Sequence, residues 1–271
     1  MPVPVFDVRE VTFRYSQVKA LDNLSLAIPP GQRVALLGAN GSGKSTLLRL
    51  LDGLAFPEHG SITFCGEPLS EERLQDPKFA YPFRQRVGLI FQNPDVQLFS
   101  PTVFDEVAFG PLQLQWPKEK VRAAVGEMLD RMKISHLEDR SPHHLSTGEK
   151  KRVTLASVLV IDPEVLLLDE PTAALDPKSA SQMIDFLIGL RGGAKTVITS
   201  THDLDIVEDI ADHCFVFQTG RVVAAGTPTE ILRQTSLLEQ TNLIHAHRHV
   251  HADGETHSHP HMHPHLHPHK H

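Results

Sequence analysis

One short segment, Gly38-Ala39-Asn40-Gly41-Ser42-Gly43-Lys44-Ser45, places the strongest constraint on how this chain can fold. It fits the pattern Gly-x-x-x-x-Gly-Lys-[Ser/Thr] and lies between an apolar run at 33–37 and a helix-like stretch at 44–52. Glycines at these positions let backbone N–H groups converge on phosphate oxygens, and the helix begins with its positive dipole end. The alternative, a chance glycine turn, does not explain these flanks. We therefore predict a nucleotide site formed by Gly38, Asn40, Gly41, Ser42, Gly43, Lys44, Ser45 and Thr46.

A second segment, which ends in two acidic residues, complements the glycine-rich one. It reads Val165-Leu166-Leu167-Leu168-Asp169-Glu170. Its four aliphatic residues predict a buried strand that delivers Asp169 to the carboxyl edge of a sheet. There Asp169 would hold Mg²⁺ together with the Ser45 hydroxyl, while Lys44 would contact the β- and γ-phosphates. Glu170 would polarise the attacking water as a general base. A solvated strand end is the simpler alternative, and two adjacent carboxylates downstream of the glycine-rich loop argue against it.

The order of apolar runs predicts an α/β fold with a mainly parallel core sheet. Buried strands are expected at 33–37, 165–168 and 196–199, with an amphipathic helix between the last two. Alternating apolar residues predict N-terminal antiparallel strands within 3–28. Helical spacing predicts a helical subdomain at roughly 92–160. We expect one domain at 1–235, followed by an irregular, disordered tail at 236–271.

The segment Leu145-Ser146-Thr147-Gly148-Glu149-Lys150-Lys151-Arg152 distinguishes among the many classes of phosphate-loop protein. It resembles the signature Leu-Ser-Gly-Gly-Gln of the ATP-binding cassette (ABC) family. The resemblance covers nearly all of residues 3–235 and keeps the family's motifs in order and at their spacing. It implies the P-loop fold of that family, with ATP and Mg²⁺ as the bound species and ATP hydrolysis coupled to transport.

The same resemblance implies roles for further residues. Gln92 looks like the Q-loop glutamine, which would act in catalysis and on Mg²⁺ beside Ser45 and Asp169. His202 resembles the switch histidine and would act with Lys44 and Glu170. Other residues similar to family positions are Tyr15 (adenine stacking), Asp176 (D-loop), and Ser146 and Gly148 (γ-phosphate). Taken singly, Tyr15 is more often a core residue and His202 more often a loop residue, so the combination carries the prediction.

The chain departs from the family signature at two positions. Thr147 stands where the family has glycine, and Glu149 stands where it has glutamine. A threonine side chain could restrict the backbone there and slow closure, so we expect modest turnover rather than inactivity.

The resemblance also has consequences for assembly. In the family, each signature motif closes over the P-loop of a second cassette, which implies a head-to-tail dimer with a second copy or a paralogous cassette. The stretch 87–99 and its continuation Ser-Pro-Thr-Val-Phe-Asp-Glu are similar to ATPases of energy-coupling-factor importers, especially the cobalt and nickel type. That likeness implies two membrane partners: a transmembrane coupling subunit, whose helix docks near Gln92, and a membrane subunit that binds the substrate. Vitamin importers use similar ATPases.

The end of the chain is rich in histidine, with 12 of the 18 histidines at 245–271. Imidazole is a preferred ligand of nickel, cobalt, zinc and copper, and interspersed prolines keep such a segment extended. A purification tag, a solubility tail and a pH-sensitive arm are the alternatives; a tag is usually a monotonous run. We predict binding of Ni²⁺ or Co²⁺ by His245, His247, His249, His251, His257, His259, His261, His263, His265, His267, His269 and His271.

Composition narrows the partners. The formal net charge of −7 argues against a nucleic-acid partner, because such proteins concentrate Lys and Arg against phosphates. The two cysteines, Cys65 and Cys214, form no metal-binding spacing and fit a reducing compartment. The longest apolar runs are too short to span a bilayer. We expect a peripheral protein on the cytoplasmic face of the cell membrane.

Two other functions remain open at this stage. One is the ATPase of a vitamin-type energy-coupling-factor importer whose tail buffers metal. The other is a nickel metallochaperone NTPase, which also joins a phosphate loop to a histidine-rich arm. That class recognises guanine through Asn-Lys-x-Asp, and this chain contains no Asn-Lys pair.

Overall fold

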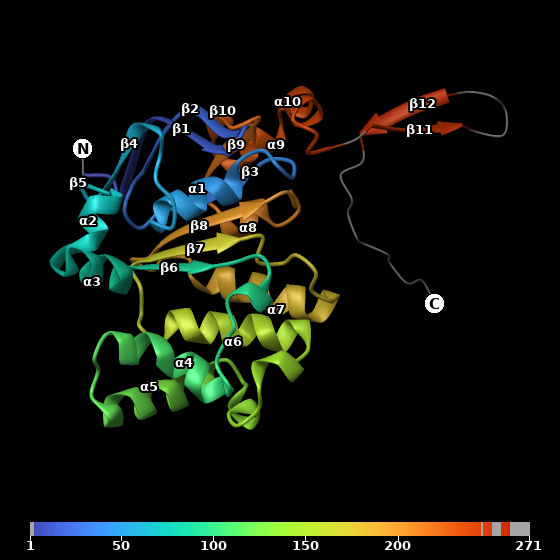
Figure 1. The fold of residues 1–271 in the computed structure, drawn as a ribbon. Coiled ribbons are helices and arrows are strands. Elements are labelled where there is room, and N and C mark those ends of the chain that lie inside the picture. The colour runs from blue at the N-terminus through green and yellow to red at the C-terminus, as the bar shows by residue number, and fades with distance from the viewer. Residues whose placement is uncertain (1–2, 245, 251–255, 261–271) are drawn as a thin grey trace, which may run out of the picture.

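A six-stranded sheet forms the centre of the computed structural model, which describes residues 3–244, 246–250 and 256–260 (Figure 1). Five neighbouring strands run parallel, and β10 pairs antiparallel with β9 at one edge. In spatial order the strands are β10 (Arg221–Gly226), β9 (His213–Gln218), β3 (Arg33–Leu37), β8 (Thr196–Thr201), β7 (Val165–Asp169) and β6 (Val87–Ile90). Because the strands are parallel, their carboxyl ends share one edge of the sheet.

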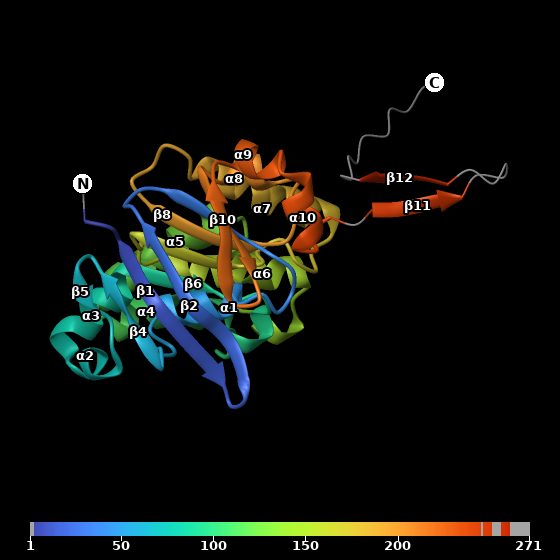
Figure 2. The same ribbon diagram turned by 90° about the horizontal axis from the view of Figure 1, so that it is seen from above.

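A second, antiparallel sheet lies across the first (Figure 2). Its strands in spatial order are β2 (Val18–Ile28), β1 (Phe6–Tyr15), β4 (His59–Phe64) and β5 (Glu67–Pro68). Helix α1 (Lys44–Leu51) packs between the two sheets, with Leu47 and Leu50 in the same buried cluster as Phe6 and Leu36. Two short helices, α2 (Glu71–Gln75) and α3 (Pro77–Arg86), follow β5.

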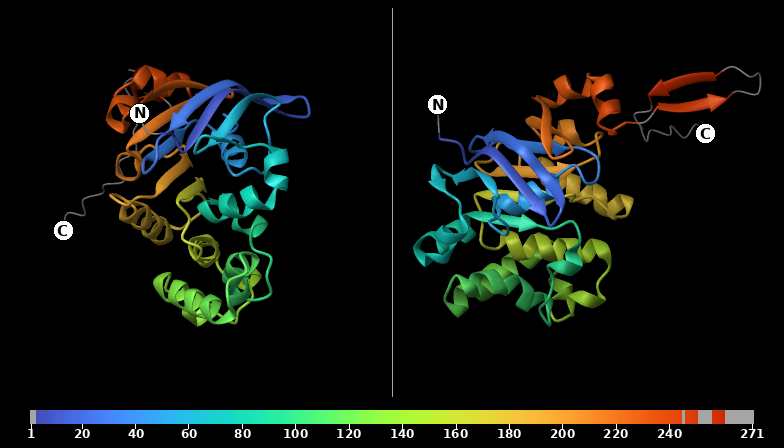
Figure 3. Two further views of the ribbon diagram at one scale, coloured as in Figure 1. Left: turned by 90° about the vertical axis from the view of Figure 1, so that its left-hand side faces the viewer. Right: turned by 45° about the horizontal axis from the view of Figure 1, so that its top comes forward.

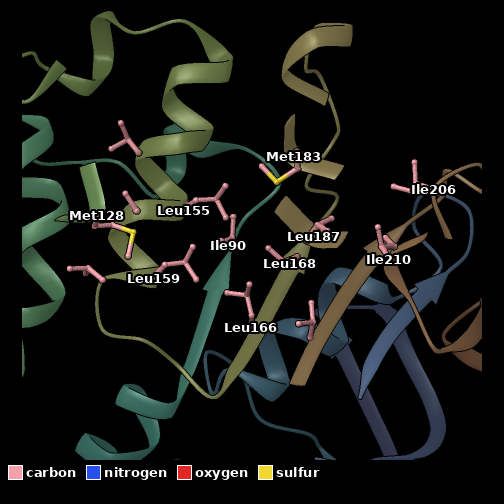
Figure 4. Close-up of a cluster of buried hydrophobic side chains, with 14 of the residues drawn as sticks. Ile90, Met128, Leu155, Leu159, Leu166, Leu168, Met183, Leu187, Ile206 and Ile210 are labelled. Atoms are coloured by element: carbon pink, nitrogen blue, oxygen red, sulfur yellow. The ribbon is translucent and has the colours of Figure 1, made fainter. Parts of the chain in front are cut away.

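Helices cover the opposite face of the central sheet and extend away from it (Figure 3). Three of them lie in the chain between β6 and β7: α4 (Val103–Gln113), α5 (Lys118–Arg131) and α6 (Thr147–Leu159). The remaining helices are α7 (Pro177–Gly189), α8 (Val207–Ile210), α9 (Pro228–Leu232) and α10 (Thr235–Gln240), with 3₁₀ turns η1 (Pro94–Val96), η2 (Ser135–Leu137) and η3 (Pro142–His144). Figure 4 shows side chains of α5, α6 and α7 meeting those of β6 and β7.

Both faces of the central strands are buried, which explains their unbroken apolar sequences. In β3, Val34 and Leu36 join the cluster under the antiparallel sheet, whereas Ala35 and Leu37 join the cluster under the helices. Side chains alternate between the two faces of a strand, so a strand covered on both faces needs apolar residues at every position. Burying one leucine in this way stabilises the fold by about 1.5–3 kcal/mol.

The predicted fold class is confirmed: a mainly parallel sheet, antiparallel N-terminal strands and a helical insertion. The packed chain continues past the predicted boundary at 235, because Leu238 on α10 and Ile244 are buried. A six-residue helix shows too little periodicity to be recognised from sequence.

Two strands of the histidine-rich tail lie among the described residues. Strands β11 (Ala246–Val250) and β12 (Thr256–Pro260) pair antiparallel, with His247 opposite His259 and His249 opposite His257. The repeat His-x-His has a period of two, which is the period of a strand, and backbone pairing needs no particular side chain.

Candidate active site

The glycine-rich loop joins the end of β3 to the start of α1, as the motif predicts. Gly41 and Gly43 have φ angles of 81° and 110°, in the region that favours glycine. A Cβ on Gly43 would also lie 2.7 Å from the carbonyl oxygen of Ala20. Among the described residues no side chain caps α1, so its first N–H groups are available to an anion. Asn40, Ser42 and Thr46 belong to the same loop and first helical turn.

Lys44 lies buried beneath this loop, with only 4% of its surface exposed. Its Nζ donates to the carbonyl oxygen of Gly38 at 2.6 Å and lies 3.4 Å from Oε1 of Glu170. The Ser42 hydroxyl is buried beside it without a hydrogen-bond partner among the described residues. A buried cation and an unsatisfied hydroxyl in a cradle of N–H groups fit the charge of a polyphosphate.

Asp169 and Ser45 meet although they are 124 residues apart. The Ser45 hydroxyl donates to Oδ1 of Asp169 at 2.8 Å, and the Ser200 hydroxyl donates to the same oxygen at 2.6 Å. A carboxylate and a hydroxyl are the hard oxygen ligands that Mg²⁺ prefers, so these residues fit that ion. Ser200 did not figure in the sequence prediction. Its position at the end of a buried strand, two residues before His202, was the available signal.

Glu170 occupies the centre of this edge and is only 4% exposed. Its φ angle is 44°, and its N–H donates to the Ser200 hydroxyl at 3.0 Å. One carboxylate oxygen, Oε2, lies 3.0 Å from Nδ1 of His202, whereas Oε1 faces Lys44. A buried carboxylate held between a histidine and a lysine is oriented for proton transfer.

Gln92 follows β6 at the same edge of the sheet, and its side chain is exposed. Its carbonyl oxygen accepts a 2.6 Å hydrogen bond from Nζ of Lys151, which is 1% exposed. Burial lowers the pKa of Lys151 to about 8, against the opposing effect of the Asp169 and Glu170 charges. The sequence prediction missed Lys151, because Lys150-Lys151-Arg152 is typical of a solvated helical face.

Tyr15 ends β1 and is 42% exposed. Its ring meets Phe13 edge-on at 4.9 Å, and its hydroxyl accepts a 3.2 Å hydrogen bond from Arg49 of α1. The exposed ring is therefore held beside the helix that follows the glycine-rich loop, where a base could stack on it.

The signature segment begins α6, and Ser146 is its N-cap. Ser146 and Glu149 form a capping box: the Ser146 N–H donates to Oε2 of Glu149 at 2.8 Å, and the Glu149 N–H donates to the Ser146 hydroxyl at 3.4 Å. The Ser146 hydroxyl hydrogen bond lowers the pKa of Glu149. Glu149, which replaces the glutamine of the family signature, thus has a structural role in the capping box that glutamine can also fill.

Thr147 is the exposed first residue of α6, in ordinary helical conformation. Any L residue adopts that backbone, and slower closure caused by the threonine side chain stays a prediction.

Gly148 allows α6 to approach the start of α7. A Cβ on Gly148 would lie 2.5 Å from the Ser179 hydroxyl oxygen. That hydroxyl donates to Oδ2 of Asp176 at 2.6 Å, and Asp176 also caps α7 by accepting from the N–H groups of Lys178 and Ser179. These hydrogen bonds, with the Ser179 hydroxyl first, lower the pKa of Asp176. Asp176 is therefore both an exposed residue and the N-cap that holds Ser179 against Gly148.

The predicted site residues form two separate groups. Contacts connect Lys44, Ser45, Asp169, Glu170 and His202 at the carboxyl edge of the sheet. The second group lies where the start of α6 meets the start of α7. It contains Ser146 and Gly148 on α6 and Asp176 at the start of α7, and Ser179 links Gly148 to Asp176. No hydrogen bond or ion pair of the described residues joins these two groups, which are called half-sites.

The predicted metal ligands of the tail are divided by what the structure describes. His247 and His249 lie in β11, and His257 and His259 lie in β12. The others, which are His245, His251, His261, His263, His265, His267, His269 and His271, lie outside the described residues. Within residues 3–244, 246–250 and 256–260, no cluster of three or more His, Cys, Asp or Glu could hold a metal ion. In the same ranges, no helix has the length and apolarity needed to cross a membrane.

Comparisons with known proteins agree with this geometry. Residues 21–173 match the ABC transporter family. The chain is 55% identical to the nickel import ATP-binding protein NikO of Rhodobacter capsulatus, covering 89% of this chain and 96% of the relative. It is 41% identical to the energy-coupling factor transporter ATP-binding protein EcfA of Methanothermobacter thermautotrophicus, covering 88% of this chain and 76% of the relative.

Among solved structures, cbiO1 of Clostridium perfringens, part of the ABC transporter complex cbiONQ, superposes with a TM-score of 0.73 at 38% identity. The superposition covers 89% of this chain and 95% of cbiO1. This chain therefore has the fold of a known ABC transporter subunit, and that fold carries its glycine-rich loop, acidic strand end and signature segment. The chain belongs to the ABC transporter family, as one of its ATP-hydrolysing subunits.

Proposed function

We propose that this chain powers the import of nickel or cobalt ions, as the ATPase of an energy-coupling-factor transporter. The observation that carries this proposal is the 55% identity to the nickel import protein NikO over 96% of that relative. The likeness to EcfA supports the transporter type, and the histidine-rich tail supports a metal as cargo.

The hydrolytic half of the site supports a direct mechanism. The N–H groups at the start of α1 and the Lys44 ammonium would bind the β- and γ-phosphates of ATP. Ser45, Asp169 and Gln92 would hold Mg²⁺, which neutralises phosphate charge when bound. Glu170 would orient a water molecule and accept its proton, and His202 would hold the Glu170 carboxylate through the contact at Oε2. These residues position and polarise, which is most of what phosphoryl transfer requires.

The second half-site supports a dimer. Ser146 and Gly148 lie at the start of α6, with its positive dipole end, and among the described residues no hydrogen bond joins them to the chain's own glycine-rich loop. A second copy or a paralogous cassette, placed head to tail, would set this helix end against ATP bound to the first. Two ATP molecules would then lie between two cassettes.

An exposed apolar patch supports docking of a helix from a membrane partner. Phe99 and Phe109 meet edge-on at 4.8 Å, and they are 62% and 41% exposed. Val96 on η1 and Leu112, one turn beyond Phe109 on α4, are also exposed. Buried Glu106 holds the loop in place by accepting from the N–H groups of Phe99 and Ser100. We assign this patch, close in sequence to Gln92, to the coupling helix of the transmembrane subunit.

The test is uptake of radiolabelled nickel and cobalt by cells that express the chain with its membrane subunits. Wild-type chain is expected to support uptake of one or both ions, whereas Glu170→Gln in the same complex is not. Uptake of a vitamin instead of either metal would favour the alternative of a vitamin-type importer with a metal-buffering tail. Membership of the ABC family already rules out the metallochaperone.

The role of the tail needs its own test on the purified chain. Deleting residues 245–271 is expected to lower the amount of Ni²⁺ or Co²⁺ bound at pH 7.5 and to leave ATP hydrolysis unchanged. Binding by the full chain should weaken near pH 6, because protonated imidazole is not a ligand. Equal metal binding by both chains would remove the tail from the proposal, and a large loss of hydrolysis would make it structural.

A further inference from the structure

Lys151 is a buried lysine on α6 that none of the predicted roles includes. It is 1% exposed, and its Nζ donates to the carbonyl oxygen of Gln92 at 2.6 Å and approaches that of Phe91 at 3.4 Å. It therefore joins α6, which begins with the signature segment, to the first residues after β6. The chain separation is 59 residues, so only the tertiary structure brings them together.

A second contact joins the same two elements. Nζ of the preceding residue, Lys150, lies 2.7 Å from Oδ1 of Asp95 on η1. The loop between them is also closed on itself: the Gln97 side chain accepts from the N–H of Phe91 at 3.1 Å and donates to the carbonyl of Leu89 at 3.2 Å. Residues 89–97 thus form a compact unit that is attached to α6 at two points.

Burying the Lys151 ammonium costs more free energy than a purely structural role requires. Within the part of the chain that the structure describes, both acceptors of its ammonium are backbone carbonyls, and no carboxylate forms an ion pair with it. Burying a charge without an ion pair is unfavourable, and an apolar residue such as methionine would fill the volume without that penalty. The nearby charges of Asp169 and Glu170 offset part of this cost, and the contact that remains is a donor placed on the Gln92 carbonyl.

We propose that Lys151 is a positioning residue that couples Gln92 to the signature segment. Lys151 follows Gly148 by three residues, less than one turn of α6, so a shift of the Gln92 peptide is passed directly to the helix end that meets the second cassette. Gln92 then reports the state of its own site to the half-site that Ser146 and Gly148 form. The inference rests on the proposed role of Gln92 in the ATPase and not on the choice of metal cargo.

The test is a double-mutant cycle on the purified full chain. Lys151→Met keeps the apolar stem and removes the donor, and we expect it to lower kcat by roughly 10–100-fold, the range expected for a lost hydrogen bond from a charged group. The KM for ATP should change by less than about threefold, because the loop that binds phosphate is untouched. In a Gln92→Ala background, which keeps the backbone carbonyl, Lys151→Met should lower kcat by less than about threefold.

Matched controls separate positioning from folding. Lys150→Met removes only the half-exposed ion pair with Asp95 and should lower kcat by less than about fivefold. If Lys151→Met does not fold, Lys151→Gln keeps an N–H donor in the cycle, and thermal unfolding identifies which variants are intact. A loss of threefold or more in the Gln92→Ala background, or no loss in the wild-type background, overturns the proposal. Hydrolysis by wild-type chain without metal uptake would overturn the cargo assignment and leave this inference standing.

Discussion

The two half-sites of this chain are built in different ways. The hydrolytic half joins residues 38–46, 169–170 and 200–202, and its central contact, Ser45 to Asp169, spans 124 residues. The signature half depends on neighbours, because Ser146 and Glu149 close their capping box within three residues. The first half needs the whole parallel sheet to exist, whereas the second needs one helix end and its contact with α7. Changes in the first should therefore abolish chemistry, and changes in the second should adjust it.

The largest expected effect is in the hydrolytic half. Glu170→Gln should lower ATP hydrolysis by roughly 10²–10⁴-fold, since general base assistance is of that size. The amide retains the shape and volume of the carboxylate, so ATP binding and ATP-driven dimerisation should persist. Steady-state hydrolysis, equilibrium ATP titration and analytical ultracentrifugation check the three expectations. Undiminished hydrolysis would show that another group is the base.

A smaller effect is expected where α6 meets α7. Gly148→Ala places a Cβ 2.5 Å from the Ser179 hydroxyl, and overpacking of this kind costs about 1–3 kcal/mol. If the displaced helix end disrupts the second half-site, hydrolysis should fall by roughly 5–160-fold, which is the same free energy converted to a rate ratio. Binding of ATP to the chain's own loop should be unchanged.

A compensating variant sharpens this expectation. Adding Ser179→Ala removes the hydroxyl that the new Cβ meets, so the double variant should hydrolyse ATP faster than Gly148→Ala alone. If the double variant is no faster, contact with Ser179 is not the reason for the glycine.

The smallest effect is expected at Glu149, and it has the opposite sign. Glu149→Gln keeps the capping box and removes a negative charge from the helix end that we place against the partner's ATP. ATP-driven dimerisation should strengthen by roughly 2–5-fold, as for a surface charge worth under about 1 kcal/mol. The same change should lower the free energy of unfolding by about 0.5 kcal/mol, because an acidic residue stabilises a helix N-terminus. A weaker dimer would argue that the carboxylate itself contacts the partner.

The contrast between the halves also explains which of these residues could be recognised from sequence. The glycine-rich loop and the acidic strand end were recognised because each is a continuous segment whose flanks set its backbone. Ser200 and Lys151 were missed because neither belongs to a recognised motif. Ser200 had a weak local signal, its place at a strand end two residues before His202, and Lys151 had the sequence context of a solvated helical face. The burial of Lys151 follows only from the packing of α6 on β6.

The tail is a second region whose secondary structure could not be predicted from sequence. Its composition predicts metal ligands. The residue pattern did not predict helix α10, which precedes the histidine-rich segment, or the pairing of β11 with β12. Short elements depend on contacts with other parts of the chain for their stability, so local propensity is a weak guide to them.

Residues close together in the chain were enough to establish the nucleotide loop, the acidic strand end, the signature segment and the α/β order of the elements. The backbone conformation of a loop, the alternation of apolar residues in a strand and the capping of a helix all depend on neighbouring residues, so they can be predicted from sequence. The contacts of Ser200 with Asp169 and Glu170, and the burial of Lys151 against Gln92, were decided by the fold alone. They depend on the order of strands in the sheet and on the packing of α6, which arise from contacts between residues far apart in the chain.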